Sequence, residues 1–374
     1  MSDDGVVESD GLLLMTPGPT RVPERVRRAG ARPMIHHRTP EFSRELATAI
    51  ELLAPLFGTR AEPLPVHTTG RGALEAVICN LFSPGDEIAV ACNGKFGEMW
   101  AGFAESYRVV VHRFSCRWGE NASAEDLDAL LDRFPKTRAV AAAYGDTSSG
   151  ALNDVAAIAR VASEHGALTM VDGVSSIGGM PFAFDDWGID VAVTASQKCL
   201  MSPPGLAWVA MSDRAWTATE TSSLPRNYWD LRAVRDSISR AKPETPGTTP
   251  VTLVLQVAEA LRQIHEEGVQ TVIARHHANA QRLRAGIVEL GLDLQCPALT
   301  TLSDTLTAIA LPSGITPKPF RDSIKARGIL TAAGLGPFEA SGFRIGHMGD
   351  IRATDIDRTL GAVRAALETA VVSG

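Results

Sequence analysis

The sequence lacks a surplus of basic residues, a long apolar run and a leader-like start. Its 374 residues contain 36 Lys and Arg against 43 Asp and Glu, a formal net charge of −7, which disfavours a nucleic-acid partner. No apolar stretch approaches the roughly 18 residues of a membrane span. The acidic start over residues 1–10 has no basic segment followed by an apolar one, so it does not resemble a signal peptide. We therefore expect a cytoplasmic protein without a nucleic-acid or membrane partner.

Cysteine pairs and nucleotide-binding glycine motifs are also missing. The five cysteines are odd in number and include no C-x-x-C, which argues against a disulfide framework and a structural zinc site. His36 and His37 are adjacent and have no evident third ligand, so we expect no metal. The absence of G-x-G-x-x-G and P-loop fingerprints disfavours a nicotinamide oxidoreductase. The length instead predicts about two ordinary globular domains, since 45% of the residues are hydrophobic and 21% are charged.

What the sequence does contain, from about residue 65 to 212, is an alternation of short apolar runs and helical periods. The runs are nearly continuous, as expected for a sheet covered on both faces. This alternation predicts an α/β fold with a largely parallel sheet. The expected strands are Ile88–Cys92, Val109–Phe114, Ala139–Tyr144, Leu168–Asp172, Val191–Ala195 and Leu206–Ala210. The expected helices between them are Glu98–Tyr107, Ala124–Arg133 and Asp154–Glu164.

The second half of the chain is less regular over residues 212–250 and then strongly helical. Long helices are expected at Val251–Glu267 and Gly268–Leu290, and His276 and His277 in the latter are expected to be solvated. The remaining pattern predicts a smaller α+β domain. Its expected strands are Leu292–Gln295, Thr305–Ala310 and Gly342–Gly346, and its expected helices are Lys318–Arg327 and Ala353–Val371. We predict a tail over 1–16, a large domain over 17–260 and a small domain over 261–374.

Two charged residues follow neighbouring apolar strands. Asp172 ends the run Leu168–Asp172, and Lys198 comes shortly after Val191–Ala195. Ligands of open α/β sheets bind beyond the carboxyl ends of the strands. An acid and an amine there suit pyridoxal 5'-phosphate (PLP), with Lys198 forming the Schiff base and Asp172 pairing with the pyridine nitrogen. The alternative for such an Asp alone is a helix cap or a turn residue.

A Gly-rich turn offers a site for the cofactor phosphate. Thr69-Gly70-Arg71-Gly72 leads into a helical run that starts at Ala73. The free backbone N–H groups and the positive end of a helix favour anions, and Arg71 could add a direct charge. By itself the motif is weak, because many helices begin with Thr and Gly.

Taken together and in order, these motifs resemble the class V aminotransferases of PLP fold type I. The resemblance runs from about Pro17-Gly18-Pro19 to the last helix and is nearest to the alanine/serine–glyoxylate (or pyruvate) aminotransferase group. It rests on Thr69-Gly70-Arg71, Asn93-Gly94-Lys95-Phe96-Gly97, Asp146-Thr147-Ser148-Ser149-Gly150, Val171-Asp172-Gly173-Val174-Ser175-Ser176, Ser196-Gln197-Lys198, Thr248 and Phe343-Arg344-Ile345-Gly346.

The resemblance implies a role for each matching residue. Lys198 would bind the cofactor and move the Cα proton, and Asp172 would hold the pyridine nitrogen. Arg344 would clamp the substrate carboxylate. The residues implied to surround the ring are Phe96 on one face, Val174 on the other and Thr147 at the 3-oxygen. Those implied to hold the phosphate are Thr69, Gly70, Arg71 and Gln197, with Thr248 reaching in from the partner subunit of a homodimer.

The resemblance also places residues 34–42 at the mouth of the site, where His36, His37 and Arg38 are candidates for substrate selection. Relatives usually carry Glu at the position of Asp146, and many have an aromatic residue or His near Gly247. These departures concern the substrate pocket rather than the cofactor.

The function implied is transfer of an amino group from alanine, serine or a related amine to a 2-oxo acid such as glyoxylate or pyruvate. Alternative donors are an aminophosphonate, ureidoglycine or a biosynthetic amine. A class V lyase such as a cysteine desulfurase is disfavoured, because residues 313–343 contain no Cys to act as its nucleophile. A non-catalytic binding protein of the same fold is disfavoured by the intact Lys198, Asp172 and Arg344.

Overall fold

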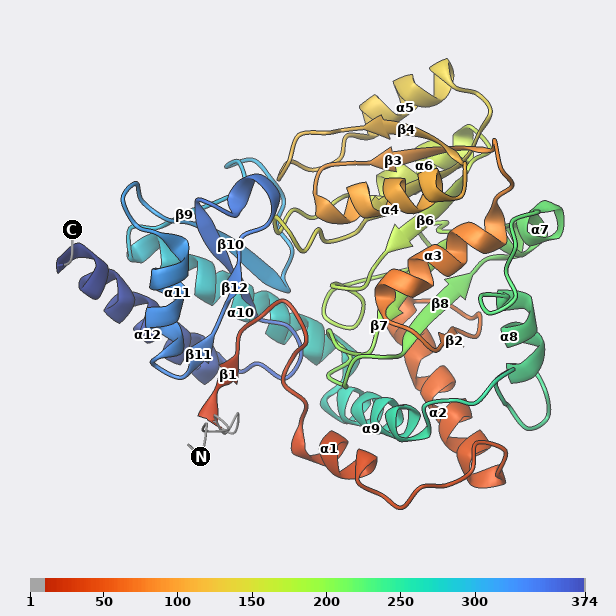
Figure 1. Cartoon of the computed structure of the whole chain (residues 1–374), viewed down its shortest axis with the longest axis horizontal. Helices are drawn as coiled ribbons and strands as arrows, with labels where there is room; N and C mark the ends of the chain where they lie inside the picture. The colour runs from red at the N-terminus through yellow and green to blue at the C-terminus, as the bar shows by residue number, and fades with distance from the viewer. Residues whose placement is uncertain (1–10, 373–374) are drawn as a thin grey trace, which may run out of the picture.

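The computed structural model describes residues 11–372, and a seven-stranded sheet with helices on both faces dominates it (Figure 1). The strand order is β2-β8-β7-β6-β5-β3-β4. The strands are β2 (Leu64–Val66), β3 (Glu87–Ala91), β4 (Val110–Phe114), β5 (Thr137–Ala143), β6 (Leu168–Asp172), β7 (Val191–Ala195) and β8 (Ala207–Met211). The pairings from β4 to β7 are parallel, whereas β8 and β2 join antiparallel. The predicted α/β fold with a largely parallel sheet is confirmed.

The two faces of this sheet are buried by different helices. Ile88 and Val90 of β3 belong to a cluster that includes residues of helices on one face, whereas the alternating Ala89 and Ala91 belong to a cluster on the other face. Successive side chains of a strand point to opposite faces, so both faces of β3 lie inside the protein. This explains why the strands were recognisable as continuous apolar runs.

Twelve helices lie among the described residues. They are α1 (Glu24–Gly30), α2 (Pro40–Phe57), α3 (Gly70–Leu81), α4 (Lys95–Ser106), α5 (Ala124–Arg133), α6 (Val155–Glu164), α7 (Asp213–Thr221), α8 (Leu231–Ile238), α9 (Val251–Glu267), α10 (Val269–Glu289), α11 (Pro317–Lys325) and α12 (Ala353–Val372). No helix was predicted at α2, and residues 212–250, where α7 and α8 form, were predicted to be less regular. None of these twelve helices is long and apolar enough to cross a membrane.

Local chemistry fixes the limits of α2. The Thr39 side chain accepts a hydrogen bond from the Phe42 N–H, and Pro40 occupies the first turn, where its missing N–H costs nothing. The helix ends at Gly58, whose φ of 65° is left-handed. Between these two ends, the apolar side chains of α2 pack against α9 in the main hydrophobic core.

A second hydrophobic cluster lies in the C-terminal part of the chain. It surrounds an antiparallel sheet in the order β12-β13-β10-β9. The strands here are β9 (Asp293–Leu294), β10 (Leu306–Ala310), β12 (Ala332–Ala333) and β13 (Gly342–Gly346), with a short 3₁₀ turn at Gly336–Phe338. The second cluster supports a smaller α+β unit, while the predicted limits 17–260 and 261–374 stay a prediction.

The N-terminal segment joins this second cluster. β1 (Leu13–Leu14) pairs in parallel with β11 (Ile329–Leu330), and Leu13 and Met15 are buried in the C-terminal core. Figure 1 shows β1 beside β11 before the chain crosses toward α1. The end of the predicted 1–16 tail is therefore a strand, and residues 1–10 lie outside the described part. A strand of two residues is too short to be recognised from its pattern, because its partner is over 300 residues away.

Candidate active site

The carboxyl ends of β6 and β7 bring an acid and an amine into one buried region. Asp172 is the last residue of β6, and Lys198 lies three residues beyond the end of β7, the neighbouring parallel strand. The Val174 N–H donates to Asp172 Oδ1 at 2.9 Å. No other hydrogen bond reaches this carboxylate from residues 11–372, so its second oxygen is available to a ligand.

The surroundings move the pKa values of this pair toward neutrality. Burial raises the pKa of Asp172 to about 6, although the Val174 N–H and the Lys198 charge oppose the change. Burial lowers the pKa of Lys198 to about 8, against the attraction of Asp172. Desolvation disfavours the charged form of either group. A strongly perturbed acid and base in one cleft are typical of a functional site.

The N-terminal segment covers Lys198. Its Nζ donates a hydrogen bond to the Pro17 carbonyl, and Thr20 Oγ1 donates to the Lys198 carbonyl at 3.1 Å. Gly18 has φ +93°, and a Cβ at this position would overlap the end of the lysine side chain. Glycine therefore suits both the backbone and the space. The Pro17-Gly18-Pro19 motif marked the start of the family resemblance, but its contact with Lys198 was not predicted.

The predicted phosphate turn lies at the N-terminus of α3. Thr69 is the N-cap, and its side chain makes no capping bond, so first-turn N–H groups face outward for an anion. A Cβ at Gly70 would overlap the Val174 side chain, which places the ring-face candidate beside this turn. Gln197 Oε1 is buried without a hydrogen-bond partner among the described residues. This atom is an acceptor, as the phosphate oxygens are, so the phosphate-binding role of Gln197 stays a prediction.

Two further predicted phosphate ligands have exposed side chains in this chain. Arg71 is exposed, and its guanidinium carbon lies 5.5 Å from the centre of the Phe103 ring. Thr248 is exposed on the loop that follows Pro246, where Pro246, Gly247 and Thr248 line a surface cavity of about 300 Å³. Their phosphate-binding roles therefore stay predictions.

Arg344 reaches the same region from β13 of the second sheet. Its Nε donates to the Ala333 carbonyl at 2.8 Å and its Nη1 to the Thr147 carbonyl at 2.6 Å. The residue is 8% exposed, and burial lowers its pKa to about 10. Among residues 11–372 no carboxylate forms an ion pair with it. A buried guanidinium without a counter-ion is costly, so this one is suited to an anionic ligand.

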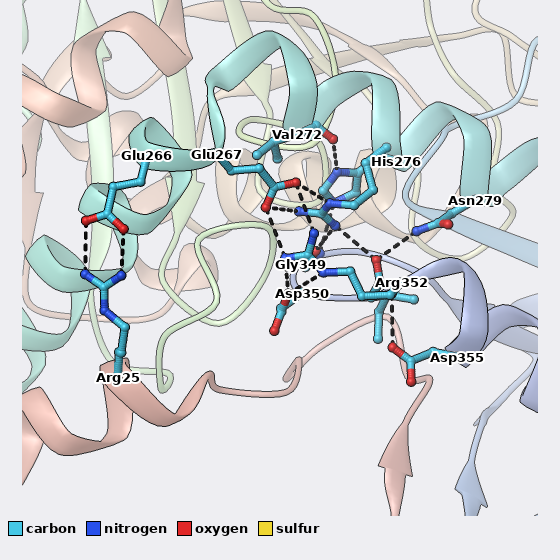
Figure 2. A network of polar contacts seen from close by, with 12 residues as sticks. Arg25, Glu266, Glu267, Val272, His276, Asn279, Gly349, Asp350, Arg352 and Asp355 are labelled. Atoms are coloured by element: carbon cyan, nitrogen blue, oxygen red, sulfur yellow. Dashed lines mark hydrogen bonds and ion pairs between the residues drawn. The ribbon is translucent and has the colours of Figure 1, made fainter.

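A polar network fixes the loop that follows β13 (Figure 2). The Arg275 guanidinium donates to the Gly349 and Ile351 carbonyls at 2.8 and 3.0 Å, while Glu267 binds Arg275 and Arg352. His276 Nδ1 donates to the Val272 carbonyl, and its Nε2 accepts from the Gly349 N–H. These contacts tie the end of the Arg344 strand to α10.

The expectation that His276 is solvated is wrong. His276 is fully buried, and burial lowers its pKa to about 4. Its neighbour His277 is exposed and bonds Asp304. The local sequence is polar around both residues, so only the packing of the 346–351 loop against α10 distinguishes them.

The ring-contact candidates are Thr147, on the loop after β5, and Phe96, at the start of the adjoining helix α4. Thr147 is buried, and its hydroxyl bonds the hydroxyl of Ser175, on the turn after Asp172. Phe96 stands in the first turn of α4, and its N–H donates to Asp146 Oδ2 at 3.2 Å. The hydroxyl pairing and the role of Asp146 were not predicted, although D-T-S-S-G has the composition of a polar turn.

The predicted selection residues contact a different loop. Arg38 donates to Glu244 at 2.5 Å and to the Thr245 carbonyl at 3.0 Å, and the rings of His36 and His37 lie 4.4 Å apart. None of the three bonds Lys198 or Arg344. Their substrate-binding role therefore stays a prediction, and Arg38 in this chain holds the loop that carries Thr248.

These residues fit PLP. The cofactor needs an amine, an anion at its ring nitrogen and N–H donors for its phosphate. Lys198, Asp172 and the start of α3 supply these three groups, and the free Asp172 oxygen is an acceptor that a protonated ring nitrogen would satisfy. No group of three or more His, Cys, Asp or Glu able to hold a metal occurs within the described part of the chain.

Comparison with known proteins also points to an aminotransferase. The family model for aminotransferase class V matches residues 22–353. The chain is 38% identical to the soluble hydrogenase small subunit of Synechococcus, over 96% of this chain and 93% of that protein. It is 37% identical to the L-aspartate–glyoxylate aminotransferase of Paracoccus denitrificans, over 90% and 86%. The crystal structure of an alanine–glyoxylate aminotransferase from Nostoc superposes with a TM-score of 0.91 at 29% identity, covering 98% and 99% of the two chains.

The fold is thus that of the PLP-dependent aminotransferases of fold type I, with the paired acid and amine at the ends of neighbouring strands. More narrowly, the chain belongs to the class V aminotransferases.

Proposed function

We propose that this enzyme transfers an amino group from alanine, serine or a related amino acid to a small 2-oxo acid such as glyoxylate or pyruvate. The observation that carries the proposal is the buried Arg344, whose guanidinium has no carboxylate partner among residues 11–372 and lies in the same region as Lys198 and Asp172. Similar proteins named for glyoxylate, with aspartate in one case and alanine in the other, support the acceptor class.

Each residue has a chemical task in this proposal. Bound PLP supplies an electron-withdrawing ring that stabilises negative charge at the substrate Cα. Asp172, ionised, would bind the protonated ring nitrogen. Lys198, whose pKa is lowered to about 8 by burial, would take the proton from Cα as its neutral amine and return it to the C4′ carbon of the cofactor.

Arg344 binds the carboxylate that amino and oxo acids share. Two carbonyls already hold its Nε and Nη1, so the guanidinium is oriented before a substrate arrives. Such preorganisation increases both the affinity and the precision with which Cα is presented to the Lys198 amine.

We further propose a cytoplasmic homodimer that shares its two sites. The exposed position of Thr248 supports this arrangement, because the residue lies on a surface loop and could serve the other subunit. Met34 and Tyr228, each 71% exposed, are large apolar side chains that a second copy could cover. A dimeric mass by light scattering is the expected result, and a monomer with full activity would refute shared sites.

The test of the function is a panel of amino donors with glyoxylate and pyruvate. Alanine, serine, aspartate, ureidoglycine, an aminophosphonate and a larger amine would each be incubated with the PLP-loaded enzyme, and oxo-acid formation measured. We expect fastest transfer from alanine or serine to glyoxylate. Preference for one of the last three donors would establish the specialised alternative, and no transfer from any donor by PLP-loaded enzyme would refute the proposal.

A further inference from the structure

The site contains a buried carboxylate to which the mechanism above gives no task. Asp146, on the loop after β5, is fully buried and forms no ion pair with any residue in 11–372. Its Oδ1 accepts hydrogen bonds from the Ser148 N–H at 2.9 Å, the Ser149 N–H at 3.0 Å and both serine hydroxyls. Its Oδ2 accepts from the Phe96 N–H at 3.2 Å. Several donors thus replace the missing cation.

The Asp146 carboxylate, which lies outside α4, caps the N-terminus of this helix. Gly94 is the N-cap and provides no side chain, while the Lys95 and Phe96 N–H groups donate to Ser148 Oγ and Asp146. A Cβ at Gly94 would overlap the Asp146 carboxyl group. The positive end of the helix favours the negative charge, so the loop after β5 and the start of α4 are held as one unit.

The same loop reaches the substrate clamp. Thr147 follows Asp146, and its carbonyl accepts the Arg344 Nη1 at 2.6 Å. The Thr147 hydroxyl bonds Ser175, on the turn after Asp172. Asp146 is also close enough for its charge to act on two other groups: burial raises the Asp172 pKa and lowers that of Arg344, and the Asp146 charge raises both.

We propose that Asp146 is a positioning residue of the transaminase site. Through its two oxygens it sets the position of Phe96 relative to Thr147, and through the Thr147 carbonyl it sets the position of Arg344. The inference rests on the proposed function, because it assigns the clamp and the ring contact to one reaction. It predicts that a change at Asp146 weakens cofactor binding and oxo-acid binding together.

The direct test is Asp146→Asn, with Asp190→Asn as a matched control. An Asn keeps one acceptor oxygen, which two backbone N–H groups of Ser148 and Ser149 require, so its amide would face the Phe96 N–H. Asp190 is also buried and accepts a backbone N–H and a serine hydroxyl, from Thr169 and Ser212. It lies at the opposite end of the sheet, before β7.

The readouts are the PLP dissociation constant of the apoprotein, followed by absorbance, and the separate kcat and KM for the oxo acid. For Asp146→Asn we expect about a tenfold increase in both the dissociation constant and KM, with a smaller change in kcat. For Asp190→Asn we expect neither constant to change. Equal behaviour of the two variants would overturn the inference and leave the proposed function intact.

A second, milder variant tests the inference even if Asp146→Asn does not fold. Ser148→Ala keeps the Asp146 carboxylate but removes the acceptor for the Lys95 N–H and one hydroxyl donor to Asp146. We expect a rise of about threefold in the PLP dissociation constant and in KM. Unchanged constants in this variant would also count against the inference. If the wild-type enzyme bound PLP but transferred no amino group, the proposed function would fail instead.

Discussion

Two buried aspartates at opposite ends of the central sheet differ in how many hydrogen-bond and ion-pair partners they have. Asp190, before β7, has its carboxylate satisfied by the Thr169 N–H at 3.0 Å, the Ser212 hydroxyl at 2.6 Å and Arg214 at 3.4 Å. Asp172, at the end of β6, receives one hydrogen bond, and burial raises its pKa to about 6. Asp190 thus contributes to stability with a completed set of partners, whereas Asp172 keeps one oxygen available for a ligand.

In such a sheet, an incomplete set of hydrogen-bond partners rather than burial marks the functional residue. Both aspartates are at least 95% buried, so burial alone does not distinguish them. What differs is whether neighbouring donors complete the carboxylate. An incompletely bonded buried charge is costly to the fold, and this cost is justified where a cofactor or a substrate supplies the missing partner.

The largest effect is expected for the lysine at the site end. Lys198→Ala removes both the amine that holds the cofactor and the base that moves the Cα proton, so transamination should fall by about 10⁴-fold or more. The visible absorption of covalently bound PLP should also disappear. Lys318→Ala, at an exposed residue that pairs with Asp322, is the control. Retained transamination in the Lys198 variant would refute the assignment.

The same substitution should affect activity at Asp172 and stability at Asp190. Asp172→Asn should lower kcat by about 10²-fold or more, because a neutral amide cannot hold a protonated ring nitrogen. It should not lower the stability of the apoprotein at pH 7, since it removes an under-bonded charge. Asp190→Asn should leave kcat unchanged and lower the free energy of unfolding by about 1–3 kcal/mol. Denaturant unfolding and steady-state kinetics of both variants test the contrast, and equal losses of stability would break it.

The arginine clamp gives a smaller, more selective effect. Arg344→Lys keeps the charge but loses the planar fork, so KM for the oxo acid should rise by about 10- to 100-fold with less change in kcat. Arg282→Lys, in an exposed pair with Asp357, should change neither. A parallel fall in kcat with an unchanged KM would show that Arg344 acts elsewhere than on the substrate carboxylate.

The pH dependence of cofactor uptake distinguishes a buried Lys198 from a solvated lysine. Burial lowers the Lys198 pKa from 10.5 to about 8, and only the neutral amine attacks the PLP aldehyde. Below pH 8 the association rate of apoprotein and PLP should therefore rise about tenfold per pH unit, and it should level off above pH 8. Stopped-flow absorbance measures this profile. A rate that keeps rising to pH 10.5 would mean an ordinary solvated lysine.

The lowered pKa of Lys198 also makes the stability of the apoprotein depend on pH. Between pH 8 and 10.5 the unfolded chain binds more protons at this lysine than the folded chain does. The contribution of Lys198 to apoprotein stability should therefore increase with pH across that window. For Asp172, whose pKa is raised from 3.8 to about 6, the folded chain binds more protons, and the contribution decreases as pH rises from 3.8 to 6.

Much of the fold was predictable because the chain signals it locally. The strands β3 and β5 to β8 are short apolar runs between turns, and every one of their ends was predicted to within two residues. The short strand β2 and the pairing of β1 with β11 were not predicted, because two or three residues carry no period. The burial of His276 was missed for a related reason: its neighbours in the sequence are polar, and its partners lie across the fold.

The candidate site divides in the same way. Asp172, Lys198 and Arg344 were expected from motifs, and they share one buried region. The Pro17 carbonyl on Lys198, the Ser175 hydroxyl on Thr147 and the carboxylate of Asp146 on Phe96 are contacts across the fold that no local pattern encodes. The position of Arg38 against Glu244 was likewise not predicted.

The class of the protein follows from its sequence, because side-chain types in a fixed order along alternating strands and helices specify both the sheet and the chemistry at its carboxyl edge. Which of those groups are left without partners depends on the tertiary structure. That outcome depends on polar groups from distant segments, such as the Pro17 carbonyl and the guanidinium of Arg344. The removal of water around Asp172 and Lys198, which moves their pKa values toward neutrality, is likewise a property of the packed chain.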